Sequence, residues 1–157
     1  MTYDLDARGG APVGLTYAGI AVRLGEPPVP DVEPRQTVLD ALAEARFSGW
    51  LGPAEPPWVI AVADNPEGSV AGGRTDLHNL AARLAAELGT VTLGISVLRD
   101  AALRLTLSVD SDVLGQYVSD PTVEMPDDDE IMPDPVGVEI AGPLVRACGQ
   151  GSADDVT

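Results

Sequence analysis

Two consecutive segments in which every second residue is apolar constrain the fold of this chain most strongly. Residues 91–97 alternate valine, leucine and isoleucine with threonine, glycine and serine, and residues 103–109 repeat the pattern with leucine and valine. A period of two is typical of a β-strand with one buried face. Residues 99–102 are enough only for a short connection, so we expect the two strands to pair antiparallel.

Three further strands are expected to extend this sheet. They are predicted at Leu15–Leu24, at Trp58–Ala63 and at about Asp112–Val118, where the last strand follows a turn at Asp110 and Ser111. Because Trp58–Ala63 is apolar at every position, we expect a central strand that is covered on both faces.

Two helices are predicted from apolar residues that recur every three or four positions. One spans about Arg35–Phe47, and the other spans Asp76–Leu88 with Thr75 as its N-cap and Gly89 as its stop. The chain is therefore predicted to have an α+β fold. We expect an antiparallel sheet of about four to five strands, with its apolar face under two main helices, followed by an acidic, proline-rich C-terminal segment.

The composition along the chain divides it into five predicted units. These are a flexible tail at residues 1–13, the α+β domain at 14–120, an acidic proline-rich loop at 121–135, a short docking segment at 136–149 and a tail at 150–157. The docking segment is expected to contain a helix that begins near Pro143 and stops at Gly149.

The chain is strongly acidic, with 25 aspartates and glutamates against 9 arginines, no lysine and a net charge of −16. Ten of the acidic residues, and no basic residue, fall between residues 105 and 145. Nucleic acids and anionic membranes attract basic surfaces, so neither is an expected partner. No apolar segment approaches the roughly 20 residues of a membrane-spanning helix. A single cysteine and the lack of a signal sequence lead us to expect a cytoplasmic protein.

One loop has the spacing of a phosphate-binding motif between a strand and a helix. It would place Gly68, Gly73, Arg74 and Thr75 around a phosphate group, with arginine where the motif has lysine. Because the lysine is absent and four residues separate the strand from the first glycine, a glycine loop that begins a helix is the favoured interpretation. A nucleotide- or phosphate-binding enzyme is the alternative.

No other motif points to catalysis, a cofactor or a metal. His78, the only histidine, lies at the edge of an apolar arc, where we expect it to pack half-exposed. Cys148 is expected to be a small buried hydrophobic residue. Asp110 and Asp112 lack the remaining ligands of a calcium loop, and no ligand pair suits zinc. We therefore predict no catalytic residue, no cofactor and no metal site.

Four stretches of sequence carry a resemblance to other proteins: Trp58–Val62, Leu80–Gly89, Leu103–Leu105 and Gln116–Pro121. Together they resemble a group of small uncharacterised bacterial α+β proteins, some of which are similar to immunity proteins of toxin systems. The chain departs from that group at the hairpin turn, where Ser111-Asp112 replaces a glycine. The resemblance implies an α+β fold and assigns no functional residue.

The charge leads us to predict a small acidic protein-binding domain. Such a domain would act like an immunity protein and neutralise a basic partner. The expected contact residues are one aromatic residue and seven acids: Trp50, Asp110, Asp112, Asp120, Asp127, Asp128, Asp129 and Glu130. A structural or assembly component that packs against copies of itself, as a homo-oligomer, is a further alternative to the enzyme.

Overall fold

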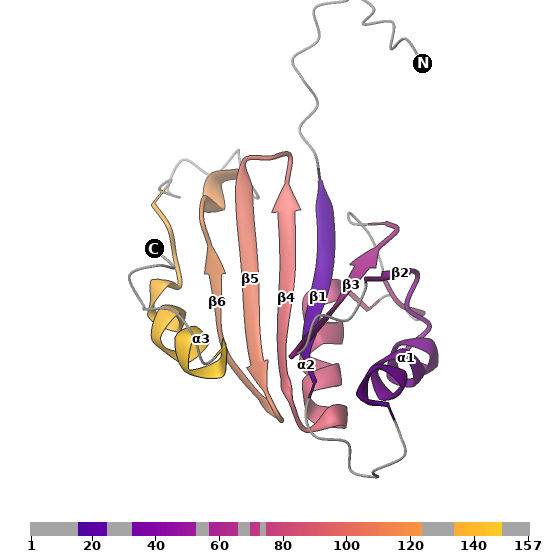
Figure 1. The fold of residues 1–157 in the computed structure, drawn as a ribbon. Coiled ribbons are helices and arrows are strands. Elements are labelled where there is room, and N and C mark those ends of the chain that lie inside the picture. Colours follow the sequence, from indigo (N-terminus) through magenta and orange to yellow (C-terminus); the bar gives the residue numbers. More distant parts are fainter. Residues whose placement is uncertain are drawn as a thin grey trace, which may run out of the picture.

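A six-stranded antiparallel sheet forms the centre of the computed structural model, which describes residues 16–24, 33–52, 57–65, 70–72, 75–123 and 134–148 (Figure 1). The strand order across the sheet is β2-β3-β1-β4-β5-β6. In chain order the elements are β1 (Tyr17–Arg23), α1 (Pro34–Glu44), β2 (Gly49–Leu51), β3 (Trp58–Ala63), α2 (Leu77–Leu88), β4 (Val91–Leu98), β5 (Ala102–Val109), β6 (Asp112–Val118), the 3-10 turns η1 (Pro121–Val123) and η2 (Val138–Ile140), and α3 (Ala141–Cys148). None of the described helices is long and apolar enough to cross a membrane.

The predicted α+β fold with an antiparallel sheet is confirmed, and the predicted strand count is one too low. The additional strand is β2, whose three residues pair with the end of β3. Gly49 permits this pairing because a Cβ atom at that position would lie only 2.1 Å from the Val62 carbonyl oxygen. A strand of three residues is too short to show a periodicity, and this is why the sequence did not reveal it.

The ends of α2 are set by two local features. Asp76 is the N-cap, because its carboxylate accepts a hydrogen bond from the backbone N–H of Asn79 at 2.9 Å. The prediction that Thr75 fills this position was wrong, since Thr75 pairs instead with Ala71 in an isolated β-bridge. Gly89 ends the helix with a φ of 58°, a left-handed conformation that glycine adopts without strain.

Helices α1 and α2 cover one face of the sheet and enclose the main core. The alternating residues of β1 and β3 that point to this face are buried together with the apolar stripes of both helices. These core residues are Ala18, Ile20, Val22, Val38, Leu42, Val59, Ala61, Ala63, Leu80 and Leu84. The strand predicted at Leu15–Leu24 is thus confirmed as β1, and its residues Ala18, Ile20 and Val22 belong to the main core.

On β4 and β5, the residues facing α2 are small and polar rather than apolar. Thr92, Thr106 and Ser108 are buried there, and the Thr92 hydroxyl donates a hydrogen bond to the Ala81 carbonyl in α2 at 2.7 Å. Gly94 is needed beneath the helix because a Cβ atom there would lie 3.0 Å from a His78 ring nitrogen. Small residues let the helix approach this part of the sheet closely.

The expectation that the helices cover the apolar face of the β4–β5 hairpin was therefore wrong. Pairing with β1 places Leu93 and Ile95 on the same side of the sheet as Ala21 and Gly19, opposite the main core. The expectation that β3 is covered on both faces was also wrong, because the Ile60 side chain is 47% exposed.

The predicted C-terminal docking segment forms η2 and α3. Leu144 and Ala147 of α3 pack against Leu107, so α3 lies on the side of the sheet opposite α2. The helix begins at Ala141, two residues before the predicted start at Pro143. The predicted stop at Gly149, residues 124–133 of the predicted acidic loop, and both predicted tails lie outside the described residues.

Candidate interaction surface

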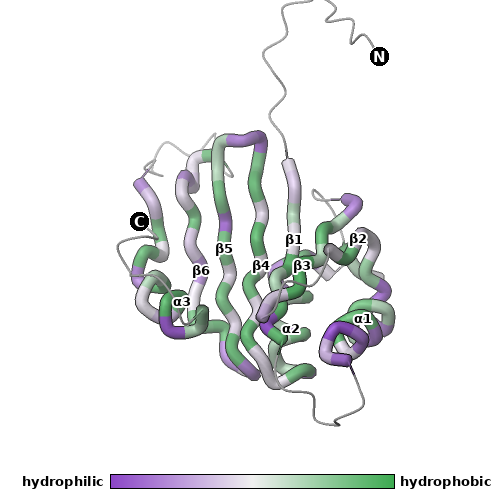
Figure 2. Tube along the Cα trace, in the orientation of Figure 1, coloured by the Kyte–Doolittle hydropathy of each residue, from purple (hydrophilic) through white to green (hydrophobic). Residues whose placement is uncertain are grey.

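The side of the sheet opposite α1 and α2 is a broad apolar surface, which we call the open face. The strand register assigns to it the side chains or glycine positions of Tyr17, Gly19, Ala21, Arg23, Trp50, Trp58, Ile60, Val62, Val91, Leu93, Ile95, Val97, Leu103, Leu105, Leu107, Val109, Asp112, Gly115 and Tyr117. Figure 2 shows the apolar colour recurring along β4 and β5, as expected for alternating strands.

The open face is continuous from one edge of the sheet to the other. A single row of register-paired residues crosses all six strands: Trp50, Val62, Gly19, Ile95, Leu105 and Tyr117. Because neighbouring strands are about 4.8 Å apart, paired side chains in such a row lie close enough to touch, and only at Gly19, which has no side chain, does the backbone take their place. The row is therefore one apolar surface rather than a set of scattered residues.

Much of the open face is accessible. The exposed fraction is 64% for Trp50, 47% for Ile60 and 42% for Tyr17, and Ile95 and Leu105 in the middle of the sheet are also partly exposed. Helix α3 covers only the end of the face near Leu107, as Figure 1 shows at the side of β6. Soluble monomers rarely expose contiguous apolar patches of this extent, and such patches mark interaction sites.

Charged groups are nearly absent from the open face. Among its described strand residues, only Arg23 and Asp112 carry a charge at neutral pH, and Asp112 pairs with Val109 at the start of β6. Both lie toward the end of the sheet where α3 packs. The rest of the surface can thus be covered without burying a charge, which is otherwise costly.

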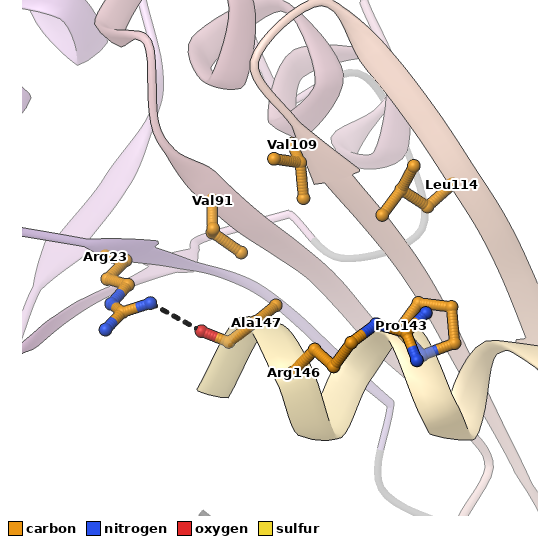
Figure 3. Close-up of a pocket in the computed structure, with 7 residues that line it drawn as sticks. All are labelled: Arg23, Val91, Val109, Leu114, Pro143, Arg146 and Ala147. Atoms are coloured by element: carbon orange, nitrogen blue, oxygen red, sulfur yellow. Dashed lines mark hydrogen bonds between the residues drawn. The ribbon is translucent and has the colours of Figure 1, made fainter. Parts of the chain in front are cut away.

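A pocket of about 320 Å³ lies where α3 meets the sheet (Figure 3). Its walls are Val91, Val109, Leu114, Pro143 and Ala147, with Arg23 and Arg146 beside them. The Arg23 guanidinium donates a hydrogen bond at 2.7 Å to the Ala147 carbonyl, one of the unpaired carbonyls in the last turn of α3. Arg23 therefore holds the C-terminal end of α3 against the open face.

The structure does not bring the predicted contact residues together. Trp50 lies on β2 at one edge of the sheet, whereas Asp110 and Asp112 lie at the turn into β6, the opposite edge. Asp120 follows β6 and accepts a hydrogen bond from the backbone N–H of Thr122 at 3.0 Å. The other four predicted contacts, Asp127, Asp128, Asp129 and Glu130, lie outside the described residues.

The predicted phosphate loop is described only in part, since Gly68, Gly73 and Arg74 lie outside the described residues. Thr75 accepts a hydrogen bond from the backbone N–H of Val70 at 3.2 Å, so the described ends of the loop pair with each other. The strand before the loop, β3, has antiparallel neighbours on both sides. Phosphate loops of this type follow a strand of a parallel sheet, and this arrangement does not favour one here.

His78 is enclosed between α2 and the sheet. One ring nitrogen lies 2.8 Å from the Thr106 hydroxyl and the other lies 3.1 Å from the Ser96 hydroxyl. Burial, reinforced by the nearby positive charge of Arg104, lowers the pKa of His78 to about 4, although Asp76 acts in the opposite direction. The ring is therefore neutral at pH 7.

The contact between His78 and Ser96 pairs a base with a hydroxyl, as in nucleophilic catalysis. The second ring nitrogen, however, faces the buried hydroxyl of Thr106 instead of a carboxylate that could stabilise an imidazolium. We interpret the three residues as a hydrogen-bonded part of the core. Cys148 is the last residue of α3 and is partly buried on the other side of the sheet, so His78 and Cys148 do not form a pair. No group of three potential metal ligands occurs among the described residues.

Sequence reasoning missed Tyr17 and Ile60 as surface residues. The strands β1 and β3 were both predicted, but their apolar residues do not say which side of the sheet the helices cover. Comparison with known proteins adds no assignment, because no protein-family model, no curated protein and no solved structure matches this chain.

Proposed function

We propose that this chain is a protein-binding domain and that its contact surface is the open face. One observation carries the proposal: an apolar row crosses all six strands, and its first residue, Trp50, is 64% exposed. Exposed tryptophan and tyrosine residues supply much of the binding energy in protein interfaces. Trp50 and Tyr17 would act as such anchors, with Ile60 between the two strands that carry them.

Site-specific photo-crosslinking tests this proposal. A photoreactive amino acid replaces Ile60 in one variant and Leu39 in another, and both are expressed in cells that naturally make the protein. Leu39 is a matched control because it is an apolar residue of α1 with 37% exposure, on the side of the sheet opposite the open face. We expect a protein adduct at position 60 and none at position 39. Equal crosslinking at both positions, or none at position 60, would contradict the proposal.

A second candidate function is recognition of a basic protein, as in an immunity-like neutraliser. It is favoured by the charge distribution, since residues 105–145 contain ten acids and no base. Asp110 and Asp112 are exposed at the β5–β6 turn, at the edge of the sheet farthest from Trp50. A basic partner would therefore contact a different region from the centre of the open face.

Salt dependence separates the two candidates. An interaction driven by exposed acids weakens as salt increases, whereas one driven by apolar burial does not. Pull-downs at low and high salt, with wild type and an Asp110→Asn/Asp112→Asn variant, distinguish them. A partner that is retained at high salt and by the variant would contradict the electrostatic candidate.

A further inference from the structure

We infer that the occupant of the open face is a second copy of this chain, so that two sheets pack face to face in a symmetric dimer. The inference rests on the proposed function, because it names the partner of the same surface. Three properties of the open face support a second copy: its area, its lack of charge and the position of α3.

The first property is area. The six strands contain three to eight residues each, and most have six or more. Each strand residue occupies about 16 Å² of a sheet, given roughly 3.3 Å along the strand and 4.8 Å between strands. The sheet thus presents roughly 600 Å² in flat projection, part of which α3 covers. Side chains enlarge the accessible area beyond this projection, so two such faces reach the lower end of stable interfaces, about 1,200 Å² in total.

The second property is charge. The chain as a whole has a net charge of −16, and two copies repel one another unless they meet where the acids are absent. The described strand residues of the open face include one acid, Asp112, at the end where α3 packs. Two copies can therefore bury this surface without opposing carboxylates. A basic partner, in contrast, would find almost no acid on it to pair with.

The third property is shape. Helix α3 covers one end of the open face, where it packs near Leu107 and contacts Arg23 at the end of β1, while the opposite end of the strands, where β1 begins, has no described helix over it (Figure 1). A two-fold axis that runs across the strands, in the plane between the two sheets, places the α3 helices of the two copies at opposite ends of the dimer. The parts of the two faces that α3 leaves uncovered can then pack at the spacing of about 10 Å that is usual for stacked sheets.

Sedimentation velocity over a range of protein concentrations tests the dimer directly. We expect wild type to sediment with twice the 16.2 kDa mass of the chain and to dissociate on dilution. Ile60→Lys places one unpaired charge from each copy in the interface, so we expect its Kd to rise by at least about 100-fold. Leu39→Lys, on α1, should leave the Kd of the dimer unchanged. Tyr17→Lys is a second interface variant in case Ile60→Lys does not fold, as judged by circular dichroism.

The outcomes distinguish this inference from the proposed function. A wild type that stays monomeric at 200 µM, or folded Ile60→Lys and Tyr17→Lys variants that dimerise like wild type, would overturn the dimer. If the dimer is overturned but position 60 crosslinks to a different protein, the proposed function is still supported. Crosslinks from position 60 to a second copy alone support the dimer, and no crosslink together with a monomeric wild type overturns both.

Discussion

His78 shows how a single residue depends on its surroundings for its charge. The ring lies between α2 and the sheet, where both nitrogens contact hydroxyl groups, and Gly94 provides the space it needs. Hydroxyls act as donor or acceptor, so Ser96 and Thr106 satisfy the neutral ring in either tautomer. Protonation would place a charge in a largely buried position near Arg104, and the pKa is accordingly lowered to about 4.

This environment predicts that acid weakens the fold through His78. The unfolded chain takes up a proton near pH 6.5, whereas the folded chain does so only near pH 4. The stabilisation is therefore complete above pH 6.5 and is lost as the pH falls to about 4. We expect a loss of about 1–2 kcal/mol in the free energy of unfolding, less than the full shift implies because the ring is partly exposed.

Urea unfolding at pH 7, 5.5 and 4.5 measures this effect. His78→Gln keeps a polar side chain that does not titrate, so its stability should change less with pH than that of wild type. The comparison removes the contribution of the carboxylates, which titrate in both proteins. If both proteins lose the same stability between pH 7 and 4.5, His78 is not the cause.

Among the elements, α3 depends most on its packing partners. It has eight residues, fewer than an isolated helix needs to be stable in water. Leu144 and Ala147 pack on Leu107, and the Arg23 side chain reaches from β1 to the Ala147 carbonyl. The helix is therefore held by the open face rather than by its own hydrogen bonds.

Leu144→Ala is expected to destabilise α3 selectively. Removing this buried side chain should lower the free energy of unfolding by about 2 kcal/mol, the low end for a leucine in a core, because the cluster under α3 is small. Hydrogen exchange should then accelerate in residues 141–148 and little in α2. Arg146→Ala, at an exposed position of the same helix, is the matched control. Equal exchange in wild type and Leu144→Ala would contradict this account of α3.

Several elements were predictable because their signals are local. The helix α2 follows from apolar spacing and Gly89, β4 and β5 follow from a period of two together with a short turn, and β6 follows from the turn at Asp110 and Ser111. The strand β2 was not predictable, because its three residues are a strand only through pairing with β3.

At the scale of the whole molecule, the uneven charge is the dominant property. All but one of the 9 basic residues lie within the first 104 positions, while residues 105–145 contain ten acids and no base. Mutual repulsion among these acids opposes a compact state, and salt screens it over a Debye length that falls from about 30 Å at 0.01 M to about 10 Å at 0.1 M.

Added salt should therefore raise the thermal stability of the protein. Between 10 and 300 mM NaCl, at one protein concentration, we expect Tm to rise by about 2–4 °C, which corresponds to about 1 kcal/mol for a domain of this size. Asp110→Asn/Asp112→Asn removes two of the exposed acids, so the rise should be smaller in this variant. A Tm that does not change with salt would show that the acids are too far apart to destabilise the fold.

Of the apolar residues in the candidate site, the sequence predicted only Trp50, which lies on the edge strand β2. Trp50 was singled out as an interface anchor, and it is the most exposed large apolar residue among those described. The acids predicted beside it lie at the opposite edge of the sheet, because strand order, which the sequence does not state, separates β2 from β6 by four strands.

By itself, the sequence determined the three helical segments and every strand except β2, and it showed that β4 and β5 each have one apolar face, since these features depend on spacing along the chain. Only the tertiary structure decided which apolar face lies under the helices. In β1 and β3 it is the face of Ile20 and Val59, whereas in β4 and β5 the helix covers Thr92 and Thr106 and leaves the apolar residues on the open face. The physical reason is that pairing register, and not hydropathy alone, fixes the side of the sheet to which each residue points.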